Sequence, residues 1–316
     1  MSMPDYPPDP NPPAVTPPST GTPASDYTIP SQFTPPANRT DPLVLPPGSA
    51  YGAWFSTIMD VAKRSWKSLL IIAAIGIAAP LAIVSLVSYS MDVGGMLSVF
   101  GFFTHSGFSF IGFLGALFVK LLLLIAAAFV TSAGWAAGSW ALVQEAKTGR
   151  SANVNEAFQF GLKRAMRLFP WAVLAGIAFF VGYLVLWVPV LAVAFGFSMF
   201  GFAATFENTG NPLTRSFTML IRNIGPTLAR VATVFGIYLV YYWIVSAIFG
   251  LLTLPGRIIG GNSFGANLLT GIIEMIATVI LAPGLAFLLI GLFVTYSELR
   301  AQEGPTSTDT LAAELG

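Results

Sequence analysis

The 316-residue sequence contains no cysteine and one histidine, and charged residues make up only 9% of it. Without cysteine the chain can form no disulfide, thiolate nucleophile or cysteine-ligated metal cluster. His105 alone cannot supply the paired histidines of a typical zinc site. The charged share is far below the roughly 25% of an average soluble domain. We therefore expect no catalytic activity, no bound metal and no cofactor.

Long apolar stretches take the place of the missing charges. Residues 168–206 form a run of 39 residues without Asp, Glu, Lys, Arg or His. A bilayer core of about 30 Å is crossed by roughly 20 helical residues, so this run is long enough for two spans. Val188 and Pro189, near its middle, mark the expected turn between them. The sequence thus predicts an integral membrane protein.

The same reasoning over the whole chain predicts an all-α, polytopic membrane protein with about six transmembrane helices. A six-span membrane domain is expected over residues 51–300. The predicted spans are residues 69–89, 110–142, 170–187, 190–206, 228–254 and 268–296.

Basic residues lie almost entirely on one side of these spans. They precede spans one, three and five and follow span six, whereas the opposite loops carry only Arg257. Cytoplasmic loops are enriched in Lys and Arg, so both termini are predicted to be cytoplasmic. The absence of cysteine fits a bacterial envelope protein, and the expected location is the bacterial cell membrane. The basic residues lie at membrane edges, and no nucleic-acid partner is expected.

The first 50 residues have a different composition. Fifteen of the 23 prolines lie between Pro4 and Pro47. Proline removes backbone donors and fixes φ, so residues 1–50 are predicted to be a disordered, proline-rich cytoplasmic tail. Such a tail is either a solvated spacer or a docking strip for a protein partner. Residues 301–316 are also predicted to be disordered.

Basic amphipathic segments precede the first, third and fifth spans. In the last of them Asn211 is a predicted N-cap and Pro212 a predicted first helical residue. Helices of this kind lie in the headgroup plane, and membrane lipids are the expected partners. The alternative is that each segment is only an elbow that orients a pair of spans. The candidate lipid-headgroup contacts are Lys63, Arg64, Lys67, Lys163, Arg164, Arg167, Arg215 and Arg222.

Two ionisable residues interrupt the predicted spans. Lys120 lies in the second span and Glu274 in the sixth. A charge inside a bilayer costs a few kcal/mol or more, so an intramembrane pair is the natural hypothesis. The pair would be either a polar transport site or a structural tie. Alternatively, Lys120 extends its stem toward the membrane surface.

Small residues and prolines predict how the spans pack and bend. Gly134 and Gly138 form a Gly-xxx-Gly pattern, which permits two helices to approach closely. Pro80 and Pro283 are expected to kink the first and sixth spans.

Aromatic, basic and proline positions in two of the basic segments resemble a known module. The resemblance rests on residues 157–164, a Pro-containing apolar hairpin, residues 211–217, Arg222 and Asn223. They are similar to the membrane domain attached to some bacterial glycerophosphoryl diester phosphodiesterases, over residues 51–300. This resemblance implies stand-alone, six-span relatives in actinobacteria, mostly uncharacterised. It implies no phosphodiesterase activity, because that chemistry belongs to a separate soluble barrel.

Two functions remain open at this point. The first is a non-catalytic scaffold or accessory subunit of the cell envelope, which fits the tail and the basic segments. The alternative is a transporter or lipid-translocating protein that uses Lys120 and Glu274. The sequence gives no indication of the oligomeric state.

Overall fold

The computed structural model describes residues 41–90, 110–185, 187–207, 210–260 and 263–315, which contain helices and no strand. These residues belong to one compact unit. In chain order the elements are α1 (Tyr51–Ala73), the π-helix η3 (Ala74–Ala78), α2 (Ala79–Ser90), α5 (Phe110–Thr148), α6 (Val154–Val185), α7 (Trp187–Gly196), α8 (Phe200–Phe206), α9 (Pro212–Arg222), α10 (Ile224–Gly260), α11 (Phe264–Ile280), α12 (Ala282–Glu303) and α13 (Thr308–Glu314).

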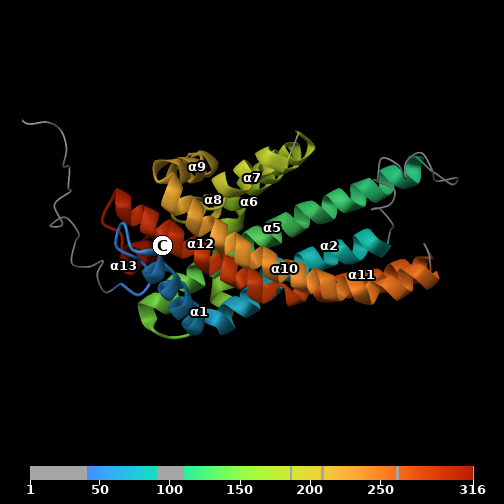
Figure 1. Cartoon of the computed structure of the whole chain (residues 1–316), viewed down its shortest axis with the longest axis horizontal. Coiled ribbons are helices and arrows are strands. Elements are labelled where there is room, and N and C mark those ends of the chain that lie inside the picture. Colours follow the sequence, from blue (N-terminus) through green and yellow to red (C-terminus); the bar gives the residue numbers. More distant parts are fainter. Residues whose placement is uncertain (1–40, 91–109, 186, 208–209, 261–262, 316) are drawn as a thin grey trace, which may run out of the picture. The chain divides into compact units, whose positions relative to one another are not determined.

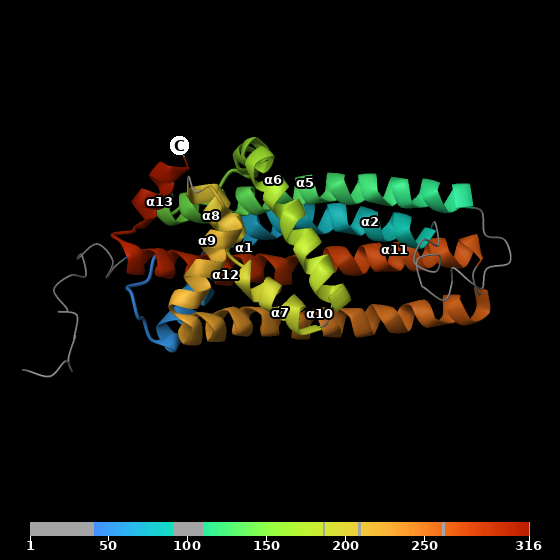
Figure 2. The same ribbon diagram turned by 90° about the horizontal axis from the view of Figure 1, so that it is seen from above.

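Long helical rods run side by side in the described structure (Figures 1 and 2). In chain order, the first rod is α1 continued by η3 and α2, the second is α5, the third is α10, and the fourth is α11 continued by α12. At 1.5 Å per residue, the 37 residues of α10 extend about 55 Å. Exposed large apolar side chains occur along α10 from Ile224 to Ile258 and are most frequent from Ile237 onward. The stretch from Ile237 to Ile258 is about 32 Å long, enough to cross a hydrocarbon core of about 30 Å.

In the described part of the chain five helices are long and apolar enough to cross a membrane, which confirms the all-α membrane class. The predicted fourth span is corrected, since residues 190–206 form the shorter helices α7 and α8. The ten residues of α7 extend only about 15 Å. Ser216 of α9 explains the break, because its hydroxyl donates to the Gly196 carbonyl and accepts from the Met199 amide. Helix α6 forms one arm of a hairpin, and α7 and α8 form the other arm, which packs against α9.

Glycines allow the predicted close crossing of helices. A Cβ built on Gly76 in η3 would lie 2.6 Å from the Gly134 Cα in α5, closer than real contacts allow. A Cβ on Gly138 would meet the side chain of Leu289 at 2.7 Å. The close approach predicted from the Gly-xxx-Gly pattern is confirmed, and it joins α5 both to the first rod and to α12.

Both predicted proline kinks coincide with interruptions of regular helix. Pro80 follows the π-helical residues of η3, and Pro283 lies in the first turn of α12, just after the break at Leu281. Tyr241 of α10 donates a hydrogen bond of 2.6 Å to the Ile280 carbonyl at this break. Proline removes a backbone donor, and the tyrosine hydroxyl supplies one nearby.

The predicted disordered C-terminal segment is wrong for residues 308–314, which form α13. Leu311 is fully buried, and Arg300 pairs with Glu314 at 2.6 Å. The predicted N-terminal tail is also too long, because residues 41–50 are ordered and Leu43 is fully buried. Asp41 accepts hydrogen bonds from the amide and the hydroxyl of Thr308. These hydrogen bonds hold both ends of the described chain together at one end of the helical rods. Residues 1–40 lie outside the described part.

Candidate functional site

Lys120 and Glu274 do not meet. Among the described residues no ion pair joins them, although pairs up to 4.0 Å are recorded elsewhere. Helix α2 packs against both α5 and α11, the helices that carry the two residues. Both side chains are half-buried rather than enclosed. The hypothesis of an intramembrane pair is therefore not supported, and His105 lies outside the described residues.

The eight basic residues predicted to contact headgroups divide into two groups. Lys63, Lys67 and Lys163 are exposed, as is most of Arg222. Lys63 lies 3.8 Å from an equally exposed Asp60, a pair that contributes little in water. For these four residues, headgroup contact stays a prediction.

The other four basic residues turn inward. Arg167 donates to the Glu207 carbonyl at 2.7 Å, and Arg164 donates to the Glu314 carbonyl at 3.2 Å. Arg215 pairs with Glu207 and Glu303. Arg64 is half-buried, and two of its buried nitrogens have no partner among the described residues. Arg164, Arg167 and Arg215 therefore join parts of the protein, whereas no such contact is shown for Arg64 in the described structure.

A network of carboxylates and arginines joins α8, α9 and α12. Glu207, just after α8, accepts from Arg215 at 2.6 Å and from the Tyr296 hydroxyl at 2.9 Å. Glu303 accepts from Arg215 and, at 2.5 Å, from Arg222. Hydrogen bonds to Glu303, and then to Glu207, raise the pKa of the Arg215 guanidinium above its usual value. The network fixes α9 against the end of α12.

Arg230 and Glu298 form the most deeply buried ion pair among the described residues. The side chains are 6% and 0% exposed. Arg230 also donates to the Ser49 carbonyl at 2.6 Å and lies 5.9 Å from the centre of the Trp54 ring. We use the name charged end for the end of the helical rods where Glu145, Arg230 and Glu298 lie.

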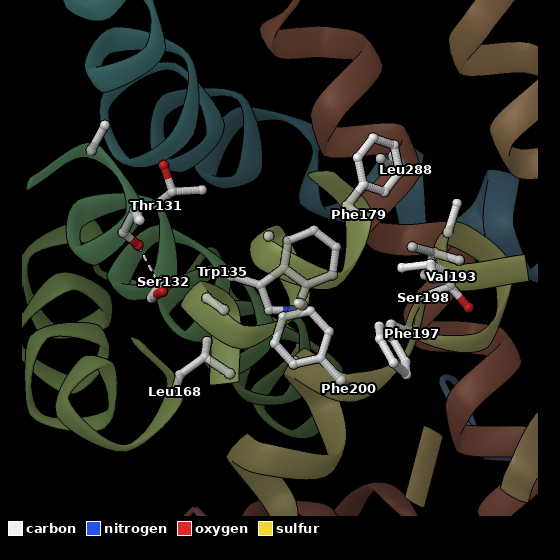
Figure 3. Close-up of a pocket in the computed structure, with 18 of the residues that line it drawn as sticks. Thr131, Ser132, Trp135, Leu168, Phe179, Val193, Phe197, Ser198, Phe200 and Leu288 are labelled. Carbon is white, nitrogen blue, oxygen red and sulfur yellow. Dashed lines mark hydrogen bonds between the residues drawn. The ribbon is translucent and has the colours of Figure 1, made fainter. Parts of the chain in front are cut away.

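A cavity of about 540 Å³ lies between α5, α6, α7, α8, α10 and α12. This volume is typical of ligand-binding pockets, which range over roughly 300–1,000 Å³. Side chains of α5, including Trp135, face those of α7 and α12 across it (Figure 3). The short α7 contributes Val193 and Ala194 to the lining, and α8 contributes Phe200 and Gly201.

Apolar groups form almost the whole wall of the cavity. No Asp, Glu, Lys, Arg or His occurs among the described residues that line it. The hydroxyls of Ser132 and Ser198 donate to nearby helix carbonyls at 2.7 and 2.8 Å. The Thr131 hydroxyl and the Trp135 indole nitrogen are buried and have no partner among the described residues. The cavity therefore suits a hydrocarbon group rather than a polar or charged molecule.

Small residues create this space. Ala172, Ala175 and Gly176 line the α6 side, and a Cβ on Gly176 would meet no atom within 4 Å. On α8, a Cβ on Gly201 would lie 2.4 Å from the Trp135 indole nitrogen, so glycine lets that ring approach α8 closely. The sequence analysis missed this site. Its signal was the small-residue face of residues 172–176, which looks like a helix-packing surface in the sequence alone.

No group of three or more His, Cys, Asp or Glu side chains able to hold a metal ion occurs in the described part of the chain. No family model, curated protein or solved structure matches the chain, so the resemblance to phosphodiesterase membrane domains stays a prediction.

Proposed function

We propose that this chain is a non-catalytic, multi-pass membrane protein that binds a membrane lipid between its helices. The cavity of about 540 Å³ carries the proposal. Its wall is apolar, and its lining helices include α5, α6 and α10, which are long enough to span a membrane. In a bilayer, lipid chains are the molecules present at high concentration next to such a space.

Exposed lysines at the charged end indicate how the protein is oriented in the membrane. Lys63, Lys67 and Lys163 are exposed near that end, and exposed cations favour the cytoplasmic side and its anionic lipids. We propose that the charged end faces the cytoplasm of a bacterial cell membrane and that these lysines contact headgroups. A role as an accessory subunit of an envelope assembly, with residues 1–40 as the docking segment, is compatible with lipid binding.

Transport through an intramembrane charge pair has less support, since Lys120 and Glu274 form no ion pair in the described structure. The lipid-binding proposal needs neither residue.

Filling the cavity tests the proposal. Gly176→Phe would add a ring at the cavity wall, because Gly176 lines the cavity and a Cβ there would meet no atom within 4 Å. Gly250→Phe is the matched control, because Gly250 also has open space around its Cβ but does not line the cavity. Native mass spectrometry of the purified proteins measures the bound lipid. We expect retained lipid for the wild type and Gly250→Phe and loss for Gly176→Phe; equal lipid in all three would contradict the proposal.

A further inference from the structure

We propose that the cavity is a blind slot that takes one lipid acyl chain with its methyl end first, from the leaflet farther from the charged end. This inference rests on the proposed function and adds the ligand class, its orientation and its leaflet. It follows from how the exposed fraction of the lining side chains changes with their distance from the charged end.

The wall is closed near the charged end. Leu168, Leu288 and Leu292 are 3%, 8% and 2% exposed. In α12, Leu292 is six residues from Glu298 and Leu288 is ten, which is about 9 and 15 Å along the helix. Leu168 directly follows Arg167, whose guanidinium donates to the Glu207 carbonyl. These three leucines form the floor of the slot.

The wall is open farther from the charged end. Leu81 of α2, Leu124 of α5 and Phe179 of α6 are 39%, 43% and 45% exposed and line the mouth. Leu124 is 21 residues from Glu145 along α5, or about 32 Å. The mouth is therefore in the half of the bilayer away from the charged end.

Volume and polarity limit the occupant to one chain. A cavity of about 540 Å³ lies in the usual range of ligand pockets and has room for one long acyl chain. A headgroup cannot occupy the floor, because the described wall offers it no charged partner and burying it unpaired costs several kcal/mol. The methyl end therefore lies beside the floor and the headgroup stays outside the mouth.

Position-specific photolabelling tests this orientation. Two phosphatidylglycerol probes carry a diazirine on one acyl chain, either beside the terminal methyl or beside the carboxyl carbon. Each is incorporated into vesicles with the full-length wild-type protein, and the labelled residues are mapped by mass spectrometry. We expect the terminal probe to label the floor, around Leu168 and Leu292, at least tenfold more than the carboxyl-side probe.

Three outcomes separate the two proposals. Stronger floor labelling by the terminal probe, lost in Gly176→Phe and kept in Gly250→Phe, supports the slot. Equal or stronger floor labelling by the carboxyl-side probe overturns the orientation while lipid binding stands. If neither probe labels the wild-type cavity more than that of Gly176→Phe, the proposed function itself fails.

Discussion

Removing both partners of the Arg230–Glu298 pair should destabilise the protein much less than the two single removals added together. Both side chains are almost fully buried, so Arg230→Met leaves the Glu298 carboxylate without its compensating charge. A lone charge at such a site costs about 3–5 kcal/mol. Glu298→Met should fall at the lower end of that range, because Arg230 keeps its hydrogen bond to Ser49 and its contact with Trp54.

The double change Arg230→Met with Glu298→Met removes both charges. Relative to the wild type, the double variant also lacks the hydrogen bond from Arg230 to Ser49, worth about 1.5–3 kcal/mol, and the cation–π contact with Trp54, worth about 1 kcal/mol. The double variant should therefore be destabilised by roughly 2.5–4 kcal/mol, well below the sum of the two single changes. The assay is the free energy of unfolding in mixed detergent micelles, followed by helical circular dichroism.

A partly exposed pair provides the control for this cycle. The Arg222 side chain is 59% exposed, so Arg222→Met should cost at most about 1 kcal/mol. If the single effects at Arg230 and Glu298 simply add, the two residues are not coupled and the reasoning is refuted.

Three other predictions follow from the packing. Gly76→Leu should prevent the α5 crossing and sharply reduce folded yield, whereas Gly115→Leu, with open space around its Cβ, should not; equal yields on size-exclusion chromatography would contradict the crossing. Deleting residues 1–40 should leave the melting temperature unchanged, whereas deleting 1–48 also removes the buried Leu43 and should lower it by several degrees. Lys120→Leu and Glu274→Leu should have effects on stability that add within about 0.5 kcal/mol, because the residues form no pair; recovery in the double variant would show that they do.

Local signals in the sequence were sufficient for much of the helical framework. Asn211 caps α9 by accepting from the Leu213 and Thr214 amides at 3.1 Å, as its residue type and the following Pro212 predict. Pro283 interrupts the last rod for an equally local reason, the missing backbone donor.

The short α7 could not be predicted in this way. Residues 190–206 are apolar throughout, so their hydropathy is that of a span. The break depends on Ser216, which lies 20 residues from Gly196 in the sequence and bonds to its carbonyl only in the folded protein. Residues on both sides of this break line the cavity, together with residues of helices far away in the sequence, so the sequence alone does not reveal it.

Charges at the membrane edge were also misread in part. A cluster of Lys and Arg predicts proximity to the cytoplasmic surface but does not reveal which side chains meet a carboxylate. Arg215 pairs with Glu303, 88 residues away, whereas Lys163 has the same charge and stays exposed. The carboxylates of Glu207, Glu298 and Glu303 determine which arginines turn inward, and these pairings are not visible in the sequence.

The most direct test of the central claim is an experimental structure of the full-length protein in lipid nanodiscs, at a resolution that shows acyl chains. We predict elongated density in the cavity, running from the floor at Leu292 to the mouth at Leu124, and its absence in Gly176→Phe. A cavity that is closed by repacked side chains, or that shows the same empty space in both proteins, would contradict the account.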